Sequence, residues 1–152
     1  MDYLVNLLTN PFLLTALTGW FVAQVLKVII HLIINKKLSW ERMIGDGGMP
    51  SGHSATVSAL AVITALLRGP GSFEFALAAI LAIIVCHDAM GVRQETGKQA
   101  RILNELIEIL ESKDLPEVKL KELVGHTPLQ VLMGILLGVI TALCMYFFLF
   151  LR

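Results

Sequence analysis

The chain has 152 residues, enough for one domain, and 56% of them are hydrophobic while only 16% are charged. Soluble domains carry about 25% charged residues, so too few polar side chains are present to cover a water-facing surface, and disorder, coiled coil and collagen are also excluded. The 12 basic and 12 acidic residues cancel, which argues against nucleic acid as a partner, because such binding depends on attraction to phosphates.

The charged residues are clustered along the chain. Segments 35–49 and 92–125 hold 5 and 13 of the 24 charged residues, and the long stretches between them hold almost none. The mean hydropathy is high, at +0.76. This distribution is typical of a polytopic membrane protein.

Four apolar stretches predict membrane-crossing helices. Phe12 to Ile34 has 23 residues, enough at 1.5 Å per residue to cross a hydrocarbon core of about 30 Å. Ser54 to Leu67 and Phe73 to Ala89 are shorter, and the Gly-Pro-Gly break between them favours a hairpin of two crossing helices shielded by longer ones. Pro128 to Leu151 carries no acidic or basic residue. We therefore expect an all-α, polytopic membrane helix bundle of about four transmembrane helices, forming a single domain over residues 1–152.

The polar segments predict the orientation of the bundle. Nine of the Lys and Arg residues lie in 35–50 and 92–127, whereas the opposite side has only Arg68 and Arg152. The positive-inside rule then predicts that both segments lie on the cytoplasmic side of the membrane. We expect this membrane to be a bacterial-type cell membrane. Apolar residues at helical spacing over 98–111 predict an amphipathic helix. We interpret 94–125 as a cytoplasmic helical insertion that packs on itself, lies on the membrane surface, or gates a substrate.

A glycine-rich segment, Gly47 to Ser54, precedes the second apolar stretch. Its glycines allow the backbone to approach a ligand closely, and Pro50 and Ser51 are suited to starting a helix. The amide groups and positive dipole end of that helix would face any anion placed there, and His53 adds a proton donor. A simple helix cap with an incidental histidine is the alternative.

Three further polar features lie near the same predicted membrane boundary. Asp88 to Arg93 ends the third stretch, and its arginine offers a planar set of donors for phosphate oxygens, unless it is only a lipid anchor. Gly125 to Gln130 starts the last stretch with a second histidine beside a helix N-terminus. Gln24, Lys27 and His31 share one face of the first helix, where ionisable residues normally face a bundle interior. Together these groups have the ingredients of phosphoryl transfer.

These motifs resemble those of a known family. Met49 to His53 contains the string Pro-Ser-Gly-His, and the strings at Gly47 to Pro50, Gly91 to Arg93 and Gly125 to Pro128 are similar to signatures of a related branch. On these residues the chain resembles the type-2 phosphatidic acid phosphatases, the superfamily that includes the vanadium haloperoxidases, and in particular its divergent small membrane branch.

The chain departs from that family at two motifs. The family's first motif is missing, and Lys27, Lys36 or Arg42 would replace it, with Lys27 preferred and Arg42 second. In the third motif, the arginine expected shortly before the histidine is Arg93, so 94–125 would be inserted within the motif. Gln130 stands where an aspartate is expected, and a neutral amide cannot stabilise a positive imidazole as a carboxylate would.

The resemblance implies the role of each site residue. It implies a phosphatase that needs no metal and no cofactor, in which His126 forms a phosphohistidine and His53 protonates the leaving group. Asp88 and Gln130 would assist these histidines. The phosphate would be held by Lys27, Arg42, Ser51, Gly52 and Arg93.

We therefore predict a lipid phosphate phosphatase that hydrolyses a phosphomonoester or diphosphate of a membrane lipid, for example phosphatidylglycerol phosphate, at the cytoplasmic face. The expected partners are this substrate, the surrounding membrane lipids and a second copy in a homodimer. One alternative is a non-catalytic binder or carrier of a phospholipid or polyprenyl phosphate. Another is a metal hydrolase that uses Asp46, His53, His87 and Asp88.

Overall fold

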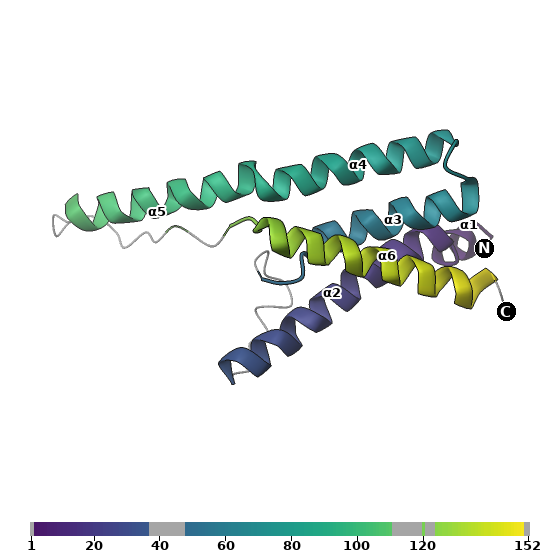
Figure 1. Ribbon diagram of the computed structural model, residues 1–152, viewed down its shortest axis with the longest axis horizontal. Coiled ribbons are helices and arrows are strands. Elements are labelled where there is room, and N and C mark those ends of the chain that lie inside the picture. The colour runs from purple at the N-terminus through teal and green to yellow at the C-terminus, as the bar shows by residue number, and fades with distance from the viewer. Residues whose placement is uncertain (1, 37–47, 111–119, 121–123, 151–152) are drawn as a thin grey trace.

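The computed structural model describes residues 2–36, 48–110, 120 and 124–150, and every regular element in these ranges is a helix (Figure 1). The predicted all-α class is thus confirmed. The elements in chain order are α1 (Asp2–Leu8), α2 (Pro11–Asn35), α3 (Gly52–Arg68), α4 (Phe73–Met90), α5 (Val92–Leu110) and α6 (Pro128–Phe150).

Side-chain caps set where the helices begin. The side chain of Asn10 accepts hydrogen bonds from the amides of Phe12 and Leu13, so that α2 begins at Pro11. Ser51 and Ser72 cap α3 and α4 in the same way. These caps satisfy amide groups that no carbonyl of the same helix can accept, which matters most where water is scarce.

Helix α3 is the centre of the bundle and contacts α2, α4 and α6. Its central residues are small and buried, and glycines of the neighbouring helices approach its backbone. A Cβ added to Gly134 or Gly138 of α6 would lie 2.5 Å from the carbonyl oxygen of Ser51 or Ala55, and one added to Gly19 of α2 would lie 3.1 Å from that of Ala55. Close packing of small residues is a main source of helix association in lipid, so these glycines hold the bundle together.

The outer surface of the bundle is apolar. α2 and α6 are long and apolar enough to cross a membrane, as is the continuous α4–α5 stretch Phe73–Ile109, whereas α3 has only 17 residues. Ile80, Ile83 and Ile84 of α4 are exposed. The expectation that the longer helices shield α4 is therefore wrong. α4 lies on the outside of the bundle, with its apolar side chains toward lipid. Of α2, α3, α4 and α6, only α3 is covered by the other three.

Helix α5 continues almost in line with α4 and extends beyond the rest of the bundle (Figure 1). It contains the predicted amphipathic stretch up to Leu110 and leaves Ile102, Leu103 and Leu106 exposed. Asn104 binds the backbone of Leu120 through two hydrogen bonds of 2.9 Å. Residues 111–119 and 121–123 of the predicted insertion lie outside the described residues.

The packing of α6 on α3 generates a prediction. Gly138→Ala places a methyl group 2.5 Å from the Ala55 carbonyl oxygen, so the helices must separate, and overpacking of this kind costs about 1–3 kcal/mol. We expect a lower free energy of unfolding in a denaturant titration of the detergent-purified protein. Gly71→Ala is the matched control, because nothing lies within 4 Å of its added Cβ. Equal stability of both variants would contradict this view of the core.

Candidate functional site

Two histidines meet where α3 and α6 begin. The ring centroids of His53 and His126 are 6.2 Å apart, with the rings in an edge-to-face arrangement. His126 is buried, with only 2% of its surface exposed, and His53 is half-buried. Residues that are 73 positions apart in the sequence thus form one pair at one end of the bundle.

The position of His126 is set by the backbone around it. Its amide donates a 2.9 Å hydrogen bond to the carbonyl of Ala89 in α4. The preceding Gly125 has φ +90°, and a Cβ there would lie 2.6 Å from the amide nitrogen of Gln94 and 2.8 Å from the carbonyl carbon of Arg93. Glycine is required on both counts. The chain therefore leaves the bundle near Arg93 and returns to the same point 32 residues later, at Gly125.

Gln130 both caps α6 and holds the His126 ring. Its side-chain Oε1 accepts a 3.0 Å hydrogen bond from the backbone amide of Thr127. Its backbone amide donates a 3.3 Å hydrogen bond to the Thr127 hydroxyl, and the two bonds form a capping box. The same Oε1 lies 3.3 Å from Nδ1 of His126. Because a carbonyl oxygen only accepts, we assign the proton to Nδ1. This tautomer places the lone pair of the imidazole on Nε2.

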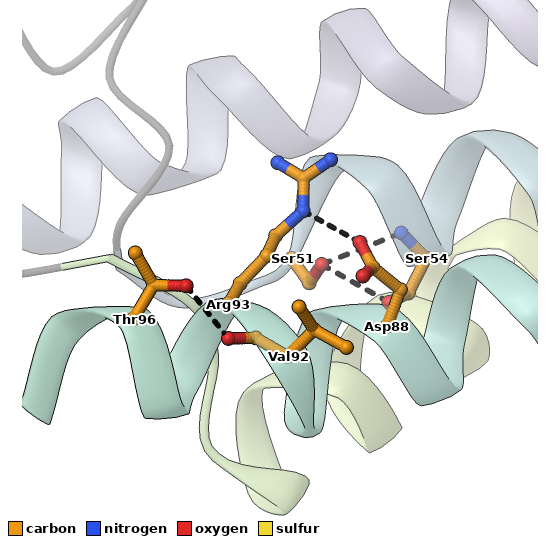
Figure 2. A network of polar contacts seen from close by, with 6 residues as sticks. All are labelled: Ser51, Ser54, Asp88, Val92, Arg93 and Thr96. Carbon is orange, nitrogen blue, oxygen red and sulfur yellow. Dashed lines mark hydrogen bonds and ion pairs between the residues drawn. The ribbon is translucent and has the colours of Figure 1, made fainter. Parts of the chain in front are cut away.

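Ser51 connects the starts of α3 and α6. It is fully buried, and its amide donates a 3.0 Å hydrogen bond to the carbonyl of Gln130. Its Oγ accepts from the amide of Ser54 at 3.3 Å and from the Ser54 hydroxyl at 3.0 Å (Figure 2). The hydroxyl hydrogen of Ser51 is not used in these two contacts. The positive end of α3 therefore lies beside the histidine pair.

Two residues of the polar face of α2, Lys27 and Gln24, lie beside the segment that leads into α3. Lys27 is only 4% exposed, and its aliphatic stem passes within 3.2 Å of a Cβ built on Gly48, whose φ is +102°. The carboxamide of Gln24 lies beside Gly52, and its Nε2 is 3.7 Å from a Cβ built on that glycine. Lys36 is exposed at the end of α2. Of the three residues considered for the missing first motif, Lys27 thus contacts the loop, and Arg42 lies outside the described residues.

Asp88 holds Arg93. The Nε of Arg93 donates a 2.7 Å hydrogen bond to Oδ2 of Asp88, and the two terminal nitrogens point away from the carboxylate, toward α2 in the view of Figure 2. A guanidinium fixed at Nε keeps its other donors aligned for an anion. The Asp88 carboxylate therefore orients an arginine here, and the described contacts do not link it to His126.

The residues proposed for a metal site do not gather in the part of the chain that the structure describes. No group of three or more His, Cys, Asp or Glu side chains is close enough there to hold a metal ion. His87 is exposed. Asp46 lies outside the described residues.

Most of the predicted site residues are thus joined by a chain of contacts. Lys27 lies against the loop, Ser51 binds Gln130, Gln130 binds His126, and His126 packs on His53. Gly52 is the first residue of α3, next to Ser51 and His53. Gly125, next to His126, lies against the backbone of Arg93. Sequence reasoning missed the place of Gln24 beside Gly52, although its spacing of three from Lys27 was the available signal.

This fold and site define a helical membrane protein with paired histidines, a buried lysine and a partly exposed arginine at one end of its bundle. Residues 8–141 match the model of the divergent PAP2 family. The chain is also 43% identical over 156 aligned positions to an uncharacterized membrane protein, YuiD, of Bacillus subtilis (strain 168), and the alignment covers 95% of this chain and 99% of the relative. The chain belongs to the divergent PAP2 family. No solved structure matches it.

Proposed function

We propose that the protein is a lipid phosphate phosphatase that acts through a phosphohistidine intermediate. The observation that carries this proposal is the pairing of His53 and His126, with ring centroids 6.2 Å apart beside the N-terminus of α3. One ring is oriented through its Nδ1 and the other is more accessible. Such a pair supplies a nucleophile and an acid on either side of a phosphoryl group.

In the first step, Nε2 of His126 attacks the phosphorus atom. A P–N bond forms while the P–O bond to the lipid breaks, and protonated His53 gives its proton to the departing oxygen. Lys27, Arg93 and the first turn of α3 balance the negative charge of the phosphoryl oxygens. With a diphosphate substrate, the departing group is the lipid monophosphate.

In the second step, neutral His53 accepts a proton from a water molecule. The water oxygen attacks phosphorus, the P–N bond breaks and inorganic phosphate is released. Both histidines return to their starting protonation states, so the cycle needs no further reactant. The resemblance to the metal-independent phosphatases supports this sequence of steps.

The substrate is a lipid whose tail lies against the apolar helices and whose phosphate lies at the site. The excess of Lys and Arg in segments 35–50 and 92–127 supports a cytoplasmic position for this end of the bundle. A phosphomonoester on that leaflet, such as phosphatidylglycerol phosphate, fits this position. A prenyl phosphate or diphosphate fits the same chemistry.

Gln130 favours a second candidate function. The amide at His126 Nδ1 carries no negative charge, so the positive charge that develops on the imidazole is less stabilised than it would be by a carboxylate. A protein that binds a phospholipid or polyprenyl phosphate without turning it over would keep the same site. Phosphate release from a lipid panel by the detergent-purified protein separates the two functions.

Replacing each histidine tests the assigned roles. With the activated ester p-nitrophenyl phosphate, whose leaving group needs no acid, we expect His126→Ala to abolish release of p-nitrophenol. His53→Ala should release p-nitrophenol in a burst and accumulate an acid-labile phosphohistidine, because only the second step is impaired. Release of phosphate from lipid substrates should fall by roughly 100-fold or more in both variants.

His87→Ala is the control for these variants, since His87 is an exposed histidine of α4. Its rate should equal that of the wild type, with and without EDTA. Full activity in His126→Ala would refute the phosphohistidine mechanism. Loss of activity in His87→Ala together with sensitivity to EDTA would favour the metal hydrolase.

Gln130→Glu tests the missing charge. A glutamate at this position keeps the capping box and replaces a neutral hydrogen bond to His126 with a charge-assisted one, so we expect the hydrolysis rate to rise roughly tenfold. Gln130→Leu should lower it. Gln99→Glu, at an exposed glutamine of α5, is the matched control. A rate for Gln130→Glu no higher than that for Gln130→Leu would contradict the role of this contact.

A further inference from the structure

Gln24 has a buried acceptor that no described residue pairs. The side-chain oxygen Oε1 is buried, and no residue in the described part of the chain donates a hydrogen bond to it. Gln24 itself is only 7% exposed. Buried polar atoms are paired in the great majority of native structures, and an exception at the edge of a binding site indicates a ligand group.

The carboxamide of Gln24 is directed at the start of α3. A Cβ built on Gly52 would lie 3.7 Å from its Nε2 and 3.9 Å from its Cδ, so the absence of a side chain on Gly52 lets the carboxamide approach the first turn of that helix. Lys27, on the same face of α2, lies beside Gly48, four residues before Gly52. The unpaired Oε1 thus belongs to a carboxamide that lies at the start of α3, beside the donors that we assign to the phosphoryl group.

An acceptor among donors selects the protonation state of the anion. The Lys27 ammonium, the Arg93 guanidinium and the amides at a helix N-terminus all offer hydrogen to oxygen. A carbonyl oxygen repels a bare phosphoryl oxygen and binds only one that carries hydrogen. We propose that Gln24 is a specificity-determining residue that accepts a hydrogen bond from the P–OH group of a singly protonated phosphoryl ligand.

This inference rests on the proposed function in one respect, which is that the ligand at this end of α3 is a phosphoryl group. It adds that the monoprotonated form is the one bound, and that tetrahedral anions without a proton are disfavoured. Sulfate has nearly the size and shape of phosphate but carries no proton at neutral pH, whereas phosphate retains at least one. The two inorganic anions therefore serve as probes of Gln24.

The experiment is a calorimetric titration of the detergent-purified protein with inorganic phosphate and with sulfate at pH 7. For the wild type, we expect phosphate to bind more tightly than sulfate by a ratio of roughly ten, the value of one hydrogen bond at a desolvated site. Gln24→Leu should reduce that ratio to about two or less, mainly through weaker phosphate binding. Gln99→Leu, the same change at an exposed position of α5, should keep the wild-type ratio.

Two further variants separate recognition from folding. Gln24→Met has the length of glutamine without its acceptor, and it should give the ratio of Gln24→Leu even if branched leucine disturbs the packing. Gln24→Glu restores an acceptor and should retain the preference for phosphate, although both anions bind more weakly. The melting temperature of ligand-free Gln24→Leu should equal or exceed that of the wild type, because an unpaired buried acceptor has been removed.

Three results would overturn the inference. The first is a phosphate-to-sulfate ratio that stays unchanged in Gln24→Leu and Gln24→Met. The second is a lower melting temperature in both, which would make Gln24 a structural residue. The third is an unchanged ratio with slower hydrolysis only of lipid phosphates that bear a free alcohol, which would assign Gln24 to that hydroxyl. Because the titration needs no turnover, the inference can hold for a non-catalytic binder and can fail for an active phosphatase.

Discussion

The whole arrangement depends on the close approach of α6 to the backbone of α3. Gly134 and Gly138 lie directly against the carbonyl oxygens of Ser51 and Ala55, and a methyl group on either would meet those oxygens at 2.5 Å. Because the helices touch at the backbone, the start of α6 is held beside the start of α3, and the Ser51 amide reaches the Gln130 carbonyl at 3.0 Å. The same contact that stabilises the bundle in lipid therefore places one histidine against the other.

The site joins groups that are costly to bury with helix ends that compensate them. Buried Lys27 belongs to a membrane helix, where an ionisable side chain is tolerated only when it faces the bundle interior. The positive ends of α3 and α6 lie at the same place, so cationic side chains and helix dipoles add to the same local positive potential. Asp88 limits this accumulation of charge by pairing with Arg93 at 2.7 Å. An end of the bundle built in this way is suited to a phosphate displayed at a membrane surface.

Much of the fold follows from the sequence, because long apolar stretches and their glycine, proline and serine boundaries define the helices directly. Sequence patterns also indicated that the motifs at His53 and His126 lie at one membrane boundary. They did not reveal that α4 faces outward, because lipid and a protein interior are equally apolar and select the same residues. The contact of Gly125 with Gln94 was also inaccessible, since it depends on a backbone path that no local pattern encodes.

The central claim is that His53, His126 and Arg93 surround one phosphoryl-binding site. The most direct test is an experimental structure of the protein in lipid with orthovanadate, a phosphate analogue that adopts the five-coordinate geometry of the reacting phosphorus. We predict vanadium bonded to Nε2 of His126, with His53 on the opposite side and Lys27 and Arg93 within hydrogen-bond distance of its oxygens. Vanadate bound elsewhere, or imidazole rings that point into separate regions of the bundle, would contradict it.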